Sequence, residues 1–280
     1  VLLKKLPFDK YRVEIDFRNP DWREALHVCI SETSQLHSRL ELVIFCTRSF
    51  ESEIKELLDQ VKGVEELISG ILPLQPDDPV SPGFLLKYCY PLIKKADPSI
   101  QVGYGTDAYF TELNRHRPVD VPFDFVSFSC NPQVHAIDTR TILENPESLP
   151  DMLETIRSFT DKPIVISPVT FRMRRKTDIG NVRTDAADPR QKQWFGAGWT
   201  LLCLYFSGGA DSIIFYQTNG DKGILDEAIS SPLFKLLTEL KIFQPVWMQL
   251  KDEDQQKKIL FENSQQESII FTLAGEYDNR

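Results

Sequence analysis

Several classes of protein are excluded by what this 280-residue sequence lacks. No apolar run approaches the roughly 20 residues that a membrane-spanning helix needs, and no signal-peptide pattern opens the chain. The formal net charge of −9 is unfavourable for a nucleic-acid ligand, because phosphate binding needs clustered Lys and Arg. The sequence therefore predicts a cytoplasmic protein with no membrane and no nucleic-acid partner. The chain opens on Val1 instead of Met, so we expect part of the N-terminal region to lie upstream.

Cysteine and histidine are too sparse to organise a disulfide framework or a metal site. The five Cys lie mostly inside apolar runs such as "LVIFC" and "LLCLYF", and none has CxxC spacing, so we expect reduced, buried side chains. The chain has four His, and no His/Asp/Glu spacing forms a recognisable metal site. Asp16, Asp107 and His135 could converge in space, but the sequence predicts neither a metal nor a cofactor.

The chain does contain a regular alternation of apolar strands and amphipathic helices. The expected strands cover residues 11–17, 40–46, 64–74, 99–106, 123–131, 162–170 and 211–220. Helical patterns separate them; one of these, "SFESEIKELLDQVKG", has a Ser at its start and a Gly at its end. Apolar strands that are each separated by a helix predict a parallel sheet with covered faces.

A closed (β/α)8 TIM barrel explains this alternation better than a doubly wound sheet. No G-x-G-x-x-G turn follows a strand, and residues 1–245 come close to the usual barrel size of about 250 residues. Because seven strands are counted, we expect the first strand and its helix to precede Val1. After residue 245 the pattern changes to short alternating runs, "KKILFEN" and "SIIFTLAG", so residues 246–280 are expected to begin a small C-terminal β domain.

Polar residues follow five of the expected strands at the points where these strands end. The C-terminal ends of barrel strands share one face, where active sites lie. The residues are Asp16 after the first strand; Thr106, Asp107, Glu112 and Asn114 after the fourth; Asn131, Gln133 and His135 after the fifth; Thr170 and Arg172 after the sixth; and Gln217, Thr218 and Asn219 after the seventh. Their convergence at one mouth predicts an active site.

Each of these residues also has a purely structural explanation. Asp107 is of a type that caps the segment after a strand, and Glu112 and Asn114 would then face solvent on a helical turn. His135 would bond to a loop carbonyl, and Arg190, after an Asp-Pro pair, would simply begin a helix. An active site explains the whole set better, because five strand ends contribute polar groups together.

Five motifs extend the argument from a fold to a family: "GTDAYFTELNR", "DFVSFSCNPQVHA", "SPVTFR", "DPRQKQWFGAGWTL" and "FYQTNG". Together, in this order, they resemble the barrel domain of the D-apionate lactonase family, from about residue 6 to residue 225. Members of that family resemble clan-A glycoside hydrolases in fold and open a sugar-acid lactone to the free acid. The resemblance implies a small carbohydrate or sugar-acid lactone as the substrate. It also implies β domains flanking the barrel, in agreement with the change of pattern after residue 245.

Lactone hydrolysis needs a base that activates water, donors for the tetrahedral oxyanion and a proton for the departing alkoxide. We expect Glu112 or His135 to act as the general base or acid, with Asp107 orienting a partner. The expected substrate-binding residues are Asp16, Tyr109, Asn114, Asn131, Arg172, Arg190, Tyr216 and Gln217. Arg172 or Arg190 would receive the product carboxylate, because guanidinium presents a planar fork of donors.

One position departs from the pattern of the family and of retaining barrel glycosidases, in which we expect a Glu after the tyrosine of the seventh strand. This chain has Gln217 there. A retaining glycosidase needs two carboxyl groups about 5–5.5 Å apart, and Gln cannot act as the nucleophile. Two alternatives to the lactonase stay open: a glycoside hydrolase that uses another carboxylate near Glu112, and an inactive barrel that binds carbohydrate.

Overall fold

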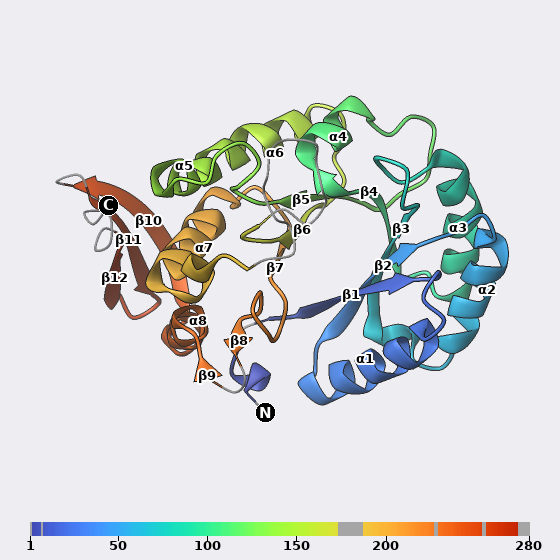
Figure 1. Cartoon of the computed structure of the whole chain (residues 1–280), viewed down its shortest axis with the longest axis horizontal. Coiled ribbons are helices and arrows are strands. Elements are labelled where there is room, and N and C mark those ends of the chain that lie inside the picture. Colours follow the sequence, from blue (N-terminus) through green and yellow to red (C-terminus); the bar gives the residue numbers. More distant parts are fainter. Residues whose placement is uncertain (1, 7, 173–186, 227–228, 254–255, 274–280) are drawn as a thin grey trace.

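The computed structural model describes residues 2–6, 8–172, 187–226, 229–253 and 256–273. In this part of the chain, seven parallel strands form one curved sheet whose order follows the sequence (Figure 1). The strands are β1 Lys10–Asp16, β2 Arg39–Phe45, β3 Ile68–Leu74, β4 Gln101–Tyr109, β5 Phe125–Cys130, β6 Ile164–Val169 and β7 Ser212–Phe215. All seven expected strands are confirmed. The expected strand over residues 64–74 is shorter than predicted, because its polar start forms the 3-10 helix η2 (Glu65–Leu67).

The helices lie on the outer side of the curved sheet (Figure 1). They are α1 Trp22–Leu36, α2 Phe50–Gln60, α3 Gly83–Ala96, α4 Phe110–Arg115, α5 Thr139–Glu144, α6 Leu149–Arg157, α7 Trp194–Phe206 and α8 Pro232–Phe243, with short 3-10 helices at η1 Leu3–Lys5, η3 Asn145–Ser148 and η4 Pro189–Lys192. A curved parallel sheet wrapped in this way by helices is the arrangement of a TIM barrel.

Strands β2, β3, β5 and β6 are largely apolar on both faces because both of their faces are buried. Leu40, Leu42 and Ile44 of β2 point into the main core, which lies between the sheet and the helices, whereas Val43 belongs to a second, smaller cluster. Phe125 fills part of this second cluster, and the absence of a side chain at Gly103 makes room for its ring: a Cβ at Gly103 would lie 2.5 Å from it. Because successive side chains of these strands point to opposite faces, the strands contribute apolar side chains to both clusters.

In the described part of the chain the curved sheet is not closed into a full barrel, and no eighth strand pairs with its two end strands. The end strands β1 and β7 approach each other but share no ladder of hydrogen bonds. The chain after β7 folds back on itself there, with the Ile224 amide donating to the Gln217 carbonyl at 2.9 Å. A short hairpin of β8 (Leu225–Asp226) and β9 (Ile229–Ser230) follows, and Leu225 packs against Leu6 and Phe234.

A separate antiparallel sheet follows α8 and lies beside α7 (Figure 1). It consists of β10 Pro245–Glu253, β11 Gln256–Asn263 and β12 Ser268–Thr272. The two β runs expected in this region correspond to β11 and β12, whereas β10 was not recognised as a strand. A C-terminal β appendage is confirmed, and its treatment as a separate domain from residue 246 stays a prediction.

No helix in the described part of the chain combines the length and the hydrophobicity needed to cross a bilayer.

Candidate active site

The carboxyl ends of β4 and β5 bring three of the predicted site residues together. Asp107 and Asn131 are each 6% exposed, and the Ser129 hydroxyl donates to the Asp107 carbonyl at 3.0 Å. Burial raises the pKa of the Tyr109 phenol, and the neighbouring Asn131 side chain offsets part of this rise. The end of β4 is thus a buried polar site with a phenol and an amide beside a carboxylate residue.

The polar residues of α4 pair with one another along the helix. Glu112 forms an ion pair with Arg115 at 3.0 Å and lies 3.8 Å from His116. Asn114 accepts hydrogen bonds from the Arg117 guanidinium, the shorter at 2.7 Å. These are the contacts expected for residues three and four apart on one helix.

The structure does not join Glu112 to His135 by any hydrogen bond or ion pair among the described residues. His135 lies on the loop after β5, where it is exposed. Neither residue is excluded by this placement, because substrate can bridge groups that do not touch. Their roles as base and acid stay predictions.

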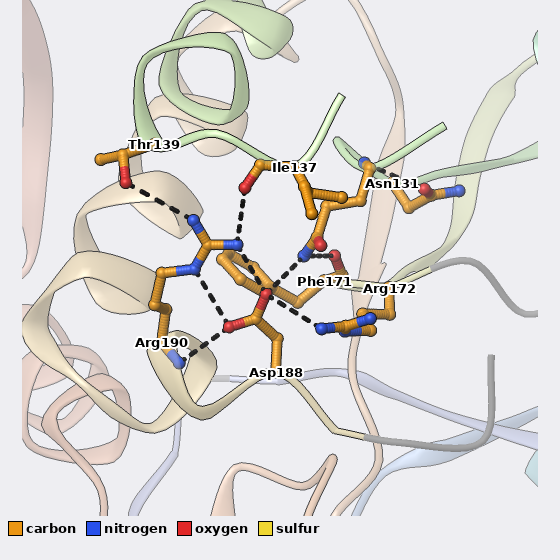
Figure 2. Close-up of polar contacts among 8 residues, drawn as sticks. Asn131, Ile137, Thr139, Phe171, Arg172, Asp188 and Arg190 are labelled. Carbon is orange, nitrogen blue, oxygen red and sulfur yellow. Dashed lines mark hydrogen bonds and ion pairs between the residues drawn. The ribbon is translucent and has the colours of Figure 1, made fainter. Parts of the chain in front are cut away.

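A buried ionic cluster ties the ends of β5 and β6 to η4 (Figure 2). Asp188, 2% exposed, accepts hydrogen bonds from two nitrogens of the Arg190 guanidinium, at 3.1 and 2.7 Å. The Gln133 amide donates to the same carboxylate at 3.1 Å, and the Arg172 guanidinium lies 3.7 Å away. Burial alone would raise the pKa of Asp188, but the hydrogen bonds from Arg190 outweigh it and hold this pKa below its usual value.

The two arginines of this cluster are used very differently. Arg190 also donates to the Ile137 carbonyl at 3.0 Å and to Thr139 at 3.5 Å, so its fork is occupied on both sides (Figure 2). The Arg172 side chain makes no hydrogen bond to any described residue, and its Nε atom is buried without a partner there. Arg190 thus links η4 to the loop after β5, whereas Arg172 makes only an ion pair with Asp188 among the described residues; the expected substrate-binding roles of both stay predictions.

A cavity of about 920 Å³ lies between β1, β6 and β7. Its apolar part is lined by η1 and α8 residues such as Leu3 and Leu240, and its polar part includes Glu14, Thr170 and Arg172. The predicted residues Tyr216 and Gln217 also line it. None of Asp107, Glu112, Asn114, Asn131 and His135 is among the described residues that line this cavity.

A polar network crosses the barrel interior beside this cavity. The Arg12 guanidinium of β1 donates to Ser167 of β6 at 2.8 Å and to Glu14 at 2.9 Å, and the Ser167 hydroxyl donates to Glu41 of β2 at 3.2 Å. Burial raises the pKa of Glu41, and the charge of Arg12 partly offsets this rise. The sequence analysis missed Arg12 and Glu14, although their spacing of two with Asp16 in "RVEID" places all three on one face of a strand.

Three further predicted residues lie at the β1 and β7 ends. Asp16 is held by Arg18 at 2.6 Å, and hydrogen bonds from Arg18 lower its pKa. The Tyr216 hydroxyl shares a 2.9 Å hydrogen bond with Thr200 of α7, so it faces that helix, and its role in substrate binding stays a prediction. Gln217 is exposed.

A search of the described residues finds no group of three or more His, Cys, Asp or Glu side chains placed to hold a metal ion.

Comparison with known proteins identifies both a family and a fold. The model of a family described as D-apionate lactonase, TIM barrel domain, matches residues 1–245. A curated relative from Brucella anthropi, named D-apionate lactonase, is 30% identical over 205 residues, which is 66% of this chain and 34% of the relative. This chain therefore spans about a third of the length of that relative.

Solved structures that superpose on this chain include several glycosidases. An exo-β-1,4-mannosidase from Opitutaceae bacterium strain TAV5 superposes with a TM-score of 0.62 at 12% identity, over 87% of this chain and 54% of that one. A β-glucosidase from Exiguobacterium marinum gives a TM-score of 0.57 at 12% identity, over 86% and 85% of the two chains. At such low identity the likeness concerns the fold alone.

Proposed function

The chain belongs to the D-apionate lactonase family, as its TIM-barrel domain, and on that premise we propose that it opens a sugar-acid lactone to the free acid. The observation that carries the proposal is the family match over residues 1–245, within which the ends of β4 and β5 gather buried polar groups. The name of the relative supplies the reaction class. The groups at the strand ends supply the chemistry that such a reaction needs.

In the proposed reaction, a base removes a proton from water while the water oxygen attacks the lactone carbonyl carbon. The tetrahedral oxyanion then collapses, the ring C–O bond breaks, and the departing alkoxide takes up a proton, which leaves a hydroxy acid. Glu112 and His135 are the candidates for these proton transfers, and Asp107 orients a partner. The hydrolysis consumes only water, so these steps balance without an oxidant, a reductant or a metal ion.

The oxyanion and the substrate hydroxyls require hydrogen-bond donors at the mouth. Asn131 is suited to this role, because its Oδ1 accepts the Gln133 backbone N–H at 3.2 Å and so identifies the other end of the amide as the donor. The Tyr109 hydroxyl lies beside it and can donate a second hydrogen bond, because a phenol is protonated at neutral pH.

The glycosidase alternative is weaker because of Gln217. The position after Tyr216 carries an amide, and retaining hydrolysis needs a carboxylate nucleophile there or close by. Lactone hydrolysis passes through no glycosyl-enzyme and is compatible with an amide at this position. The third alternative, a barrel that binds sugar without turnover, is an outcome of the same test.

The test is acid release at constant pH from a panel of aldonolactones and branched-sugar lactones, with nitrophenyl glycosides measured alongside. Glu112→Gln and His135→Asn are compared with Glu144→Gln, a matched control in which the carboxylate also pairs with an arginine of its own helix. We expect acid release by the unsubstituted chain and the control, and a loss of about 100-fold or more in at least one of the other variants. Full activity in both would refute the assigned roles.

Two other outcomes would replace the proposal. Nitrophenol release would establish a glycosidase and require a second carboxylate near Glu112. If the chain hydrolyses neither substrate class while sugars still raise its melting temperature, it is a barrel that binds carbohydrate without turnover.

A further inference from the structure

The pairing of β4 with β5 is interrupted where the candidate site lies. Gly105 lies opposite Ser127, and the next paired residues are Tyr109 and Ser129. Four positions along β4 therefore match two positions along β5, and the additional residues form a β-bulge that includes Asp107. Bulges are common at barrel rims and beside active sites, where they redirect side chains. The course of this bulge decides where the side chains at the end of β4 lie.

The chain is fixed just before the bulge. The Gly105 N–H donates to the Ser81 hydroxyl at 3.1 Å, and the Gly105 carbonyl accepts the Ser81 N–H at 2.8 Å. A Cβ at Gly105 would collide with the Ser127 backbone, so β4 approaches β5 there as closely as a glycine allows. The bulge starts from this fixed point, and its course depends on the contacts of residues 106–108.

One side chain of β5 holds the bulge. The Ser129 hydroxyl donates to the carbonyl oxygens of both Asp107 and Ala108, the first at 3.0 Å. Within the bulge, the Thr106 hydroxyl accepts the Ala108 N–H at 3.0 Å. Thr106, Asp107 and Ser129 are all buried. Because a buried carbonyl that loses its donor is costly, removal of the Ser129 hydroxyl should let the bulge shift towards another partner.

A second buried serine makes the same type of bond far from the mouth. The Ser69 hydroxyl donates to the Leu40 carbonyl of β2 at 2.6 Å, and Ser69 is 7% exposed, compared with 6% for Ser129. Ser69 lies near the N-terminal end of β3, whereas the mouth is formed by the C-terminal strand ends. Ser69 is therefore a matched control for the loss of a buried hydroxyl.

We propose that Ser129 is a positioning residue, which holds the β4 bulge so that Asp107 and Tyr109 face the bound lactone. The inference rests on the proposed function, in which Asp107 orients a partner and the Tyr109 hydroxyl is a donor beside Asn131. Ser129 acts through these residues, because its own hydroxyl is used by the two bulge carbonyls. A displacement of reacting groups by about 1 Å can cost a factor of about 100 in rate.

Amide hydrogen exchange, measured by mass spectrometry on peptides that cover residues 103–110, tests whether Ser129 holds the bulge. Ser129→Ala is expected to raise the exchange rate of these peptides by about 10-fold or more. Ser69→Ala should leave them unchanged and affect only peptides of β2 and β3. Ser129→Thr keeps the hydroxyl and should exchange as the unsubstituted chain does. Unchanged exchange in Ser129→Ala would overturn the inference.

The rate of acid release from the best lactone tests whether the bulge matters for the chemistry. Rates are measured at a temperature at which circular dichroism shows every variant folded. Ser129→Ala should lose about 10-fold or more in kcat while its KM changes by less than about 2-fold, because Asp107 and Tyr109 act on the transition state. Ser69→Ala should keep both constants, and Ser129→Thr should recover most of the kcat. Equal kcat values for Ser129→Ala and Ser69→Ala would overturn the inference, as would a Ser129→Thr variant as slow as Ser129→Ala.

The two measurements separate this inference from the proposed function. Lactone hydrolysis with normal exchange, or with an undiminished kcat, in Ser129→Ala would refute the inference alone. No hydrolysis by the unsubstituted chain would refute the proposed function, and faster exchange in Ser129→Ala would then still show that its hydroxyl holds the bulge.

Discussion

The two sides of the barrel mouth are built from different kinds of contact. On the β4–β5 side, the charged residues of α4 pair with neighbours three or four positions away, as Glu112 does with Arg115. On the side formed by β6, β7 and β1, the partners are far apart in sequence: Arg12 of β1 bonds to Ser167 of β6, and Asp188 accepts a bond from Gln133, which follows β5. Local pairs on a helix surface contribute little stability, whereas buried long-range pairs are costly to break. Substitutions should therefore reduce activity on the first side and stability on the second.

The largest effect is expected for Asp188→Asn. The substitution leaves the half-buried Arg190 guanidinium without its counter-charge, although the amide keeps some of the hydrogen bonds. We expect a loss of about 3 kcal/mol in the free energy of unfolding, measured by chemical denaturation. A loss below about 0.5 kcal/mol would show that the two sides do not differ as proposed.

The same carboxylate should make the stability depend on acid. The folded pKa of Asp188 is lowered, so its contribution is fully present above the ordinary carboxyl pKa and is lost as pH falls through the folded value. Between about pH 5 and pH 3, the free energy of unfolding should fall more steeply for the unsubstituted chain than for Asp188→Asn. Equal slopes in urea titrations would contradict this.

A smaller effect is expected for Tyr216→Phe. The phenol hydroxyl is buried against Thr200, and the Thr200 hydroxyl keeps its own bond to the Gly196 carbonyl at 2.8 Å after the substitution. We expect a loss of about 1 kcal/mol in the free energy of unfolding, and a smaller additional loss when Thr200→Val is combined with it. Strict additivity of the two substitutions would argue against this hydrogen bond.

The smallest effect on stability is expected for Glu112→Gln. Its carboxylate is 23% exposed and pairs within one short helix, so the free energy of unfolding should change by about 0.5 kcal/mol or less. A large loss of stability would place Glu112 among the structural ties and remove the reason for assigning it to the chemistry.

The strands of the parallel sheet could be predicted from the sequence, because most of them are apolar runs bounded by polar turns. The sequence did not predict β10, because the charged residues of this strand obscure its alternation of apolar and polar side chains. It also did not predict the roles of Arg12 and Glu14, although the alternation of side chains along β1 places both on one face of the strand. Asp188 was recognised only as the residue before a helix start, a role it does fill by accepting the Arg190 backbone N–H. Its bond to Gln133, 55 positions away, depends on tertiary structure and has no local signal.

The most direct test of the division between the two sides is a rate measurement with product inhibition. Acid release from the best lactone would be followed with and without added free acid, for the unsubstituted chain, Glu112→Gln/His135→Asn and Arg172→Gln. We predict that the double variant loses about 100-fold or more in kcat, and that Arg172→Gln keeps measurable turnover while its inhibition constant for the acid rises about 10-fold or more. An undiminished kcat in the double variant, or an unchanged inhibition constant in Arg172→Gln, would contradict this account.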